Sequence, residues 1–481
     1  MLAIEKQFEE NIVRELKNNN LAIFAGAGLS RASGYVDWKS LLSGIATNLG
    51  LNIDRETDLI SLTQYYCNDY GRQGINEAII EQFEKDAKGN VNLDILAQMP
   101  IEVYWTTNYD SLIEDTLTKH KKKVDRKIEQ SQLKYYKPNR DVIVYKMHGD
   151  KDHPDEAVIT RDDYEEFNRK RYLFTTNLKG QLIEKTFLFI GFSFEDPNLE
   201  QVLSRIRIEL MSKSPKNHYC FFKKVSKEKY KTDGDNCYDE VRYKEDEIRQ
   251  NLRIKDLRRY GINTILVEEY DDITKILERI YIKYRLDNIF ISGSAEVYGD
   301  FNKENAEEFL HNLSKRLISE SCNIISGFGL GVGSFIINGA LDEIFSKGQS
   351  IEKKLILRPF PQKKSGEKSL KSLWTEYRNE MISMAGVSIF VFGNKRTLDT
   401  TDISIANGML EEFEIAKAKG NFIIPIASTG YASQLIMDYV KENIEEYWYL
   451  KESITTLENE KDSSKLILEV IKILNKIRSD L

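Results

Sequence analysis

The chain has 481 residues, with 69 Lys and Arg against 76 Asp and Glu, and its formal net charge at pH 7 is −7. This length exceeds the size at which one hydrophobic core usually keeps growing, so we expect two domains. Charged residues make up 30% of the chain and are evenly mixed, which leaves no basic field that could neutralise a phosphate backbone. Nucleic acid is therefore not an expected partner.

Residues 1–20 have the pattern of an acidic amphipathic helix and lack the apolar centre of a secretion signal. No run in the sequence approaches the roughly eighteen apolar residues that a membrane span needs. We therefore predict a cytoplasmic protein that does not associate with membranes.

The cysteine and histidine residues argue against a metal site. Cys67, Cys220, Cys237 and Cys322 are too widely spaced for a zinc ribbon, and they are too few for a secreted disulfide scaffold. The five histidines show no metal-ligand spacing either. We expect reduced thiols and no bound metal.

Four apolar runs in the first half predict strands that each end in a short motif. In chain order these motifs are Gly26–Ser30 (GAGLS), Thr107–Asp110 (TNYD), His148–Asp150 (HGD) and Gly191–Phe194 (GFSF). Amphipathic stretches between the strands predict helices and right-handed crossovers, which give an α/β fold with a parallel sheet. Because the ends of parallel strands meet at one edge of an open sheet, we predict an active site there.

The first motif has the composition of a phosphate-binding turn. Glycines in a strand-to-helix turn let the backbone approach a pyrophosphate, and amides at the following helix meet its charge. Gly26, Gly28 and Ser30 fit this role. A tight turn that only packs a helix on the sheet remains the alternative.

Asn108 and His148 are the candidate catalytic residues of the first half, because each follows an apolar strand. The amide of Asn108 can donate and accept, which suits the orientation of a ribose hydroxyl or an attacking water. His148 precedes a glycine that opens space around the ring, as a general base requires. The alternatives are an Asx-turn cap for Asn108 and a structural role for His148.

A second domain begins after the helical pattern of residues 273–284, near Arg285. The alternation of strands and helices then restarts, which predicts a small Rossmann-like domain. We assign residues 1–284 to the first domain and 285–481 to the second. The predicted strands of the second domain are residues 288–294, 323–326, 355–358, 387–392 and 422–427.

Glycine motifs also follow the first two strands of this second domain. Gly293 and Ser294 end the first strand, and residues 327–334 (GFGLGVGS) follow the second. Four glycines at alternate positions are typical of a loop that faces a nucleotide, with a flexible turn as the alternative. Arg378 and Lys395 add cations that could meet phosphates, although either could be an ordinary surface charge.

The ordered set GAGLS, TTNYD, HGD and GFSF, followed by Asp196-Pro197-Asn198, resembles the sirtuin family, and more closely its bacterial defence-associated branch than its protein deacylases. The resemblance covers roughly residues 1–284. It implies cleavage of the nicotinamide–ribose bond of NAD+, with Asn108 and His148 as the catalytic pair. The NAD-binding residues implied by the resemblance are Gly26, Ala27, Gly28, Ser30, Asp37, Asp110, Phe192 and Ser193.

Two departures from the deacylase pattern change the expected chemistry. The paired cysteines of the sirtuin zinc module are absent, and Asp37-Trp38-Lys39 stands where that family has Asp-Phe-Arg. Recognition of an acyl-lysine is therefore disfavoured. With no acyl oxygen to capture the ribosyl cation, we expect water to be the acceptor and the products to be ADP-ribose and nicotinamide.

The segment of about residues 286–450 resembles the SLOG nucleotide-binding superfamily. The match includes a helix in which an arginine precedes a methionine. Where enzymatic members carry a glycine-rich loop that leads to a glutamate, this chain has Gly393-Asn394-Lys395 and an insertion before Glu411-Glu412-Phe413. This break favours a sensor over a second hydrolase. The signal-binding residues implied by the resemblance are Gly293, Ser294, Gly329, Gly331, Arg378, Lys395 and Glu412.

The order of a sirtuin-like and a SLOG domain resembles the effector family of the Thoeris antiphage systems. The resemblance implies NAD+ depletion in abortive infection, activated by a cyclic ADP-ribose isomer from a partner protein with a TIR domain. It also implies a homotetramer. The identity of the isomer, any change of assembly and the binding of NAD+ to the SLOG site stay open, as do two alternatives: an NAD-dependent protein deacylase and a non-catalytic nucleotide-binding scaffold.

Overall fold

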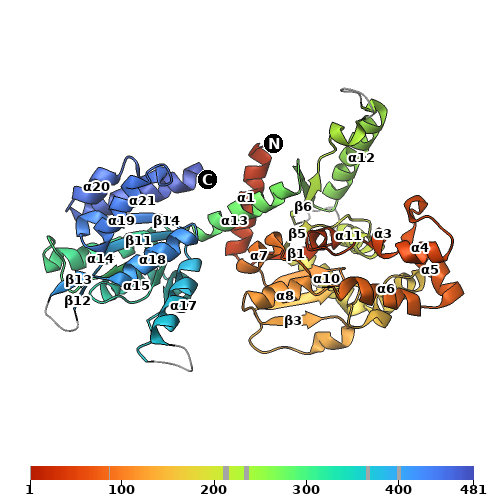
Figure 1. The fold of residues 1–481 in the computed structure, drawn as a ribbon, viewed down its shortest axis with the longest axis horizontal. Coiled ribbons are helices and arrows are strands. Elements are labelled where there is room, and N and C mark those ends of the chain that lie inside the picture. The colour runs from red at the N-terminus through yellow and green to blue at the C-terminus, as the bar shows by residue number, and fades with distance from the viewer. Residues whose placement is uncertain (1, 86, 210–215, 232–237, 364–368, 398–401) are drawn as a thin grey trace. The chain divides into compact units, whose positions relative to one another are not determined.

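The computed structural model describes residues 2–85, 87–209, 216–231, 238–363, 369–397 and 402–481. The chain divides into two compact units, Met1–Tyr281 and Ile282–Leu481 (Figure 1). In the described part, no helix is long and apolar enough to cross a membrane, and no group of three or more His, Cys, Asp or Glu side chains is placed to hold a metal ion. Cys67, Cys220 and Cys322 are free thiols, and Cys237 lies outside the described residues.

The described strands of the first unit form one seven-stranded parallel sheet, in the order β3-β4-β2-β1-β5-β6-β7. The predicted α/β class is confirmed. The strands are β1 (Leu21–Ala25), β2 (Val103–Thr106), β3 (Val124–Lys127), β4 (Val142–Lys146), β5 (Thr186–Ile190), β6 (His218–Lys223) and β7 (Ile262–Val267).

Register places the ends of four neighbouring strands at the same level. Ala25 pairs with Thr106 on one side and with Ile190 on the other, and Thr106 pairs with Lys146. The segments that follow β4, β2, β1 and β5 therefore leave the sheet side by side at its carboxyl edge.

Helices pack against this sheet. The face that carries Phe24 and Trp105 packs against α10, α11 and the end of α12. The helices of the first unit are α1 (Leu2–Lys17), α2 (Ala27–Arg31), α3 (Trp38–Leu41), α4 (Ser43–Asn48), α5 (Leu59–Tyr70), α6 (Gln73–Phe83), α7 (Val91–Gln98), α8 (Leu112–Lys119), α9 (Arg161–Lys170), α10 (Tyr172–Glu184), α11 (Pro197–Glu209) and α12 (Glu240–Arg258), with short 3₁₀ turns η1 (Ile53–Arg55), η2 (Gln130–Lys134), η3 (Pro154–Glu156) and η4 (Lys227–Tyr230). Helix α13 (Asp271–Arg285) begins in the first unit and ends in the second.

Helices α3 to α6, which lie between β1 and β2 in the chain, gather at one end of the first unit (Figure 1). They have their own apolar core, built from residues such as Leu42, Ile75 and Ile79. Tyr109, from the segment after β2, and Ile159, from the segment after β4, are buried in the same core. This group of helices therefore packs directly against two segments at the carboxyl edge of the sheet.

The described strands of the second unit form a five-stranded parallel sheet, in the order β10-β9-β8-β11-β14. These strands lie where the sequence predicts them: β8 (Asn288–Ser294), β9 (Asn323–Ser326), β10 (Leu355–Leu357), β11 (Val387–Phe392) and β14 (Phe422–Ile426). A hairpin that the sequence did not predict, β12 (Asn394–Arg396) with β13 (Ile403–Ile405), follows β11. The hairpin falls where the sequence predicts an insertion, between Lys395 and Glu411, and residues 398–401 of that stretch lie outside the described residues.

The chain order of the second sheet reverses between β8 and β11, the position at which open α/β sheets bind ligands beyond their strand ends. The helices of this unit are α14 (Lys303–Ser319), α15 (Gly333–Ser346), α16 (Ile351–Lys354), α17 (Leu370–Ser383), α18 (Asn407–Ala418), α19 (Ala432–Glu442), α20 (Ile454–Asn459) and α21 (Ser463–Asp480), with η5 (Ala427–Thr429) and η6 (Trp448–Leu450).

A glycine lets two helices of the second unit approach closely. A Cβ at Gly339 in α15 would lie 2.0 Å from the carbonyl oxygen of His311 in α14. We therefore expect Gly339→Ala to force the two helices apart and to destabilise the second unit by about 1–3 kcal/mol, measured by calorimetric unfolding. Gly180→Ala is the control, because Gly180 is an exposed glycine of α10 with nothing within 4 Å of its added Cβ. This control should leave stability unchanged or raise it by up to about 1 kcal/mol, and equal effects of the two variants would contradict the packing argument.

Candidate active site and candidate nucleotide site

The glycine turn after β1 packs backbone to backbone against the segment after β5. Gly28 donates its amide to the carbonyl of Gly191 at 2.8 Å. Gly191 has φ +65°, and a Cβ there would lie 2.1 Å from the nitrogen of Leu29, so both its conformation and its neighbour require glycine.

The same turn remains open to a ligand on its outer side. Gly26 is buried and donates its amide to Ile190, whereas Ala27 is half-buried and Gly28 is exposed. The amides of Gly26 and Gly28 are thus engaged by the protein, and the exposed surface of the turn lies at Ala27 and Gly28.

Asn108 is buried and lies beside the glycine turn. Its Nδ2 donates to the hydroxyl of Ser30 at 3.0 Å, and its backbone amide donates to Thr106 Oγ1 at 3.0 Å. The Asx turn of this segment is made by Asp110, whose Oδ1 accepts from the Leu112 amide at 3.0 Å. The carboxamide of Asn108 is therefore directed to the predicted NAD-binding serine and does not cap the turn.

His148 is buried and lies beside Asp196, a charged residue of the segment after β5. The Nε2 of His148 lies 3.2 Å from Asp196 Oδ2, without the geometry of a hydrogen bond. The rings of Tyr164 and Phe167 flank the imidazole edge-on. Burial lowers the pKa of His148, and although the Asp196 carboxylate opposes this shift, the pKa stays below its usual value. His148 is therefore neutral at pH 7.

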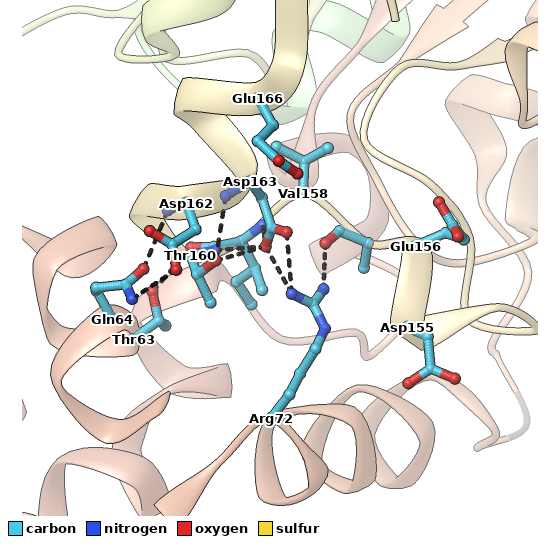
Figure 2. Close-up of polar contacts among 12 residues, drawn as sticks. Thr63, Gln64, Arg72, Asp155, Glu156, Val158, Thr160, Asp162, Asp163 and Glu166 are labelled. Carbon is cyan, nitrogen blue, oxygen red and sulfur yellow. Dashed lines mark hydrogen bonds and ion pairs between the residues drawn. The ribbon is translucent and has the colours of Figure 1, made fainter. Parts of the chain in front are cut away.

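The segment after His148 is fixed by the neighbouring helices (Figure 2). Arg72, at the start of α6, forms an ion pair with Asp163 of α9 at 2.8 Å and donates to the carbonyl of Ala157. Val158 in turn donates its amide to the carbonyl of His148 at 2.8 Å. Burial raises the pKa of Asp163, but hydrogen bonds from Arg72 and the segment's backbone outweigh it and hold that pKa below its usual value.

Several buried polar atoms near this edge have no hydrogen-bond partner among the described residues. They include atoms from four different segments: Asp110 Oδ2, His148 Nε2, Asn198 Nδ2 and Trp38 Nε1. Buried polar groups are almost always paired, so such a concentration suggests a ligand that supplies the missing partners. The set contains both donors and acceptors, as the carboxamide and hydroxyl groups of a nicotinamide riboside would need.

Three of the predicted NAD-binding residues have other contacts in this structure. Asp37 caps α3 by accepting from the Ser40 amide at 2.9 Å and lies 3.7 Å from Arg31. The ring of Phe192 packs on Phe24 with centroids 4.9 Å apart, and the carbonyl of the exposed Ser193 accepts from Arg253.

Sequence reasoning assigned no role to Trp38, Tyr164, Asp196 or Asn198. Asp196 and Asn198 belong to the quoted motif, so the signal was present without a function attached to it. Tyr164 donates to Asp196 at 3.4 Å, and its ring contacts those of Trp38 and His148. These contacts depend on α3 and α9, which no strand-end motif identifies.

Arg378 is the centre of a buried polar cluster in the second unit. Its Nη1 lies 2.9 Å from Glu411 and its Nε 3.2 Å from Glu412, and the guanidinium lies over the ring of Phe360. Glu412 also accepts from the hydroxyl of Ser292 at 2.6 Å. Burial raises the pKa of Glu412, although Ser292 and Arg378 oppose this shift. The cluster thus joins α17, α18 and the end of β8.

The predicted glycine loops of the second unit meet beside this cluster. Ala295, which follows Gly293 and Ser294, donates its amide to the carbonyl of Leu330, between Gly329 and Gly331. Ser294 Oγ donates to the carbonyl of Asn394 at 3.0 Å.

Asn394 and Lys395 are adjacent on β12 but have different environments. Asn394 is buried, and its Oδ1 accepts from the amides of Glu296 and Val297, so it shapes the loop after β8. This role of Asn394 was not foreseen from the sequence. Lys395 is exposed.

Family comparisons match each half of the chain. Residues 102–244 match a SIR2-like domain, and residues 272–477 match the Sir2- and TIR-associating SLOG family. The predicted sirtuin-like and SLOG character of the two halves is therefore confirmed.

Similar proteins cover nearly the whole chain. NAD(+) hydrolase ThsA of Cytobacillus dafuensis is 45% identical over 98% of this chain and 96% of its own length. NAD(+) hydrolase ThsA of Bacillus cereus (strain MSX-D12) is 43% identical over 99% of both chains. Defense-associated sirtuin 2 of Bacillus subtilis is 26% identical over 41% of this chain and 20% of its own length. The chain belongs to the ThsA family.

Proposed function

We propose that this chain hydrolyses NAD+ to ADP-ribose and nicotinamide at the carboxyl edge of the first sheet. The observation that carries the proposal is the set of unpartnered buried atoms of Asp110, His148 and Asn198, on the segments that follow β2, β4 and β5. The activity named for the relatives that match nearly the full chain supports it.

In this proposal the dinucleotide lies across the turn after β1. Its pyrophosphate lies over the outer surface of the turn formed by Gly26, Ala27, Gly28 and Ser30. The nicotinamide riboside then reaches Asn108 and His148. The other residues proposed to contact NAD+ are Asp37, Asp110, Phe192 and Ser193.

The reaction breaks the bond between the anomeric carbon and the nicotinamide nitrogen, and a water oxygen forms the new bond to that carbon. Nicotinamide leaves as a neutral molecule, the ribose gains oxocarbenium character in the transition state, and one proton is released. Asn108, held by Ser30, orients the water or a ribose hydroxyl. Neutral His148 polarises a ribose hydroxyl through Nε2, and Asp196 stabilises any charge that the imidazole gains.

The second unit acts in this proposal as the sensor of a cyclic ADP-ribose isomer made by a TIR-domain partner. Its signal-binding residues are Gly293, Ser294, Gly329, Gly331, Arg378, Lys395 and Glu412. The description of the matched family, which names association with Sir2 and TIR domains, supports this role. Signal dependence is physically necessary, because a constantly active NAD+ hydrolase would kill its host, so a second equilibrium must restrain it.

The cellular role follows from this pair of sites. The chain works in the cytoplasm as a Thoeris effector, depletes NAD+ in abortive infection and assembles as a homotetramer. No metal takes part in the proposed reaction, so a chelator should leave turnover unchanged.

We expect Asn108→Ala and His148→Ala each to lower turnover at least about 100-fold while the protein stays folded, because each removes a group that positions or polarises the reacting atoms. Nicotinamide release in the presence of the signal is followed by chromatography, and circular dichroism checks the fold. Near-normal NAD+ loss in both variants would end the assignment. Addition of an acylated peptide separates hydrolysis from deacylation, because only a deacylase needs peptide to consume NAD+.

The pH profile tests the state of His148. Because the pKa of His148 lies below 6.5, the neutral form persists and kcat/KM should stay level from pH 8 to about 6.5, then fall as the imidazole becomes protonated. Asp196→Asn keeps an oxygen that can cap α11 but removes the charge that raises this pKa, so the acidic limb should move to lower pH. Glu195→Gln, an exposed neighbour, should leave the limb in place. A shift of the Asp196→Asn limb to higher pH would contradict the assignment.

Arg378→Gln should weaken activation, because the variant loses a charge-assisted contact to a phosphate, worth about 1.5–3 kcal/mol or roughly 10–100-fold in signal affinity. Glutamine avoids placing a third carboxylate beside Glu411 and Glu412. The signal concentration that gives half-maximal nicotinamide release is the measurement, and Lys371→Gln on the exposed face of α17 is the control. An unchanged response would refute the sensor assignment.

A further inference from the structure

Lys146, the last residue of β4, has a completely buried side chain two positions before His148. A lysine is almost never fully buried unless its charge is paired. Burial lowers the pKa of Lys146, but the surrounding carboxylates outweigh this effect and raise it, so the side chain stays charged. The fold therefore keeps a permanent cation beneath the candidate active site.

The ammonium of Lys146 reaches across to the segment that carries Asn108. Its Nζ donates to the carbonyl of Tyr109 at 3.2 Å and to the carbonyl of Asp110. These are the two residues that directly follow Asn108. The ammonium thus fixes the backbone of the turn from which the carboxamide of Asn108 extends.

The same ammonium also holds the segment that carries His148. It forms an ion pair with Asp150 Oδ2 at 2.7 Å, and Asp150, two residues after His148, is as fully buried as the lysine. Glu114 of α8 lies 3.6 Å away, and Arg126 lies 3.4 Å from Asp150 as a second cation. Lys146 and Asp150 therefore bracket His148 along the chain and are joined to each other.

Tyr109 makes a second connection between the two segments. Its carbonyl accepts from the Lys151 amide at 3.0 Å, and its hydroxyl donates to the carbonyl of Val158 at 2.8 Å. Val158 is the residue whose amide donates to the carbonyl of His148.

We infer that Lys146 is a positioning residue of the NAD+ hydrolysis site, which holds the Asn108 turn and the His148 segment at a fixed separation. The inference rests on the proposed function, in which these two side chains act on one ribose. A lysine suits the task because one compact ammonium carries three donors, enough for two carbonyls and a carboxylate. Burying such a charge is costly, and an apolar residue would serve stability alone at least as well.

The neighbouring strand β3 provides a matched control, because it also ends in a buried lysine, and this lysine has a purely structural role. Lys127, the last residue of β3, is also buried, forms an ion pair with Asp125 at 2.9 Å and donates to the carbonyl of Tyr135 at 2.6 Å. Its partners belong to β3 and the segment after it, which carry neither Asn108 nor His148. Lys127→Met therefore removes a buried ion pair of the same kind from the same sheet.

The experiment compares Lys146→Met with Lys127→Met in the full chain with the signal present. We expect Lys146→Met to lower kcat for nicotinamide release about 100-fold, because a displacement of about 1 Å at a reacting group has an effect of this size, with the KM for NAD+ changed less than about threefold. Lys127→Met should keep kcat within about threefold of the wild type. Thermal unfolding of both variants shows whether they fold equally.

A second variant keeps the test decisive if Lys146→Met does not fold. Asp150→Asn leaves the lysine in place and removes the charge of the nearer of its two carboxylate partners, and we expect a fall of about tenfold in kcat with the KM for NAD+ unchanged. Equal kcat in the Lys146→Met and Lys127→Met variants, or an effect confined to KM, would overturn the positioning role while Asn108→Ala stays inactive. If instead Asn108→Ala keeps full turnover, the catalytic assignment fails and the positioning role fails with it.

Discussion

Four neighbouring parallel strands end at the same level of the sheet, and this alignment determines which side chains of the first unit can come into contact. Since Ala25, Thr106, Lys146 and Ile190 lie in register, the segments that follow β1, β2, β4 and β5 emerge together. The backbone contact of Gly28 with Gly191 then draws two of these segments close. A side chain at Gly191 would separate them, so the geometry of the site depends on the absence of a Cβ as much as on the groups that are present.

The candidate active site departs from the rule that buried polar groups form hydrogen bonds. Asp110, His148 and Asn198 each retain an atom without a hydrogen bond, which costs stability in the free protein. The surrounding bonds offset this cost: Arg72 with Asp163, Tyr109 with Val158 and Lys146 with Asp150 are all satisfied around the unsatisfied groups. Rigid surroundings and unpaired reacting groups are what a preorganised site requires.

Strand positions and strand-end motifs could be predicted from the sequence, because buried strands are short apolar runs and their ends carry polar residues or glycine. Asn108 and Ser30 are brought into contact, as neighbouring strand ends allow. The sequence could not predict that Asp196, 48 residues further on, lies beside His148, or that Asn394 would hold the loop after β8. Such contacts depend on loop conformation and helix packing, which leave no periodic pattern. The hairpin β12–β13 was missed for the same reason, since each strand has only three residues.

The candidate site residues His148 and Arg378 differ in how far the protein already pairs them, and this difference fits their proposed roles. His148 is neutral and its Nε2 makes no hydrogen bond, so a substrate can engage it without displacing a protein group. Arg378, in contrast, is already paired with Glu411 and Glu412. A phosphate that reaches Arg378 must compete with carboxylates, and the groups it releases must find other partners. In the proposed sensor role, phosphate binding at Arg378 is coupled to a rearrangement of α17 against α18, which a switch needs and a rigid catalytic centre does not.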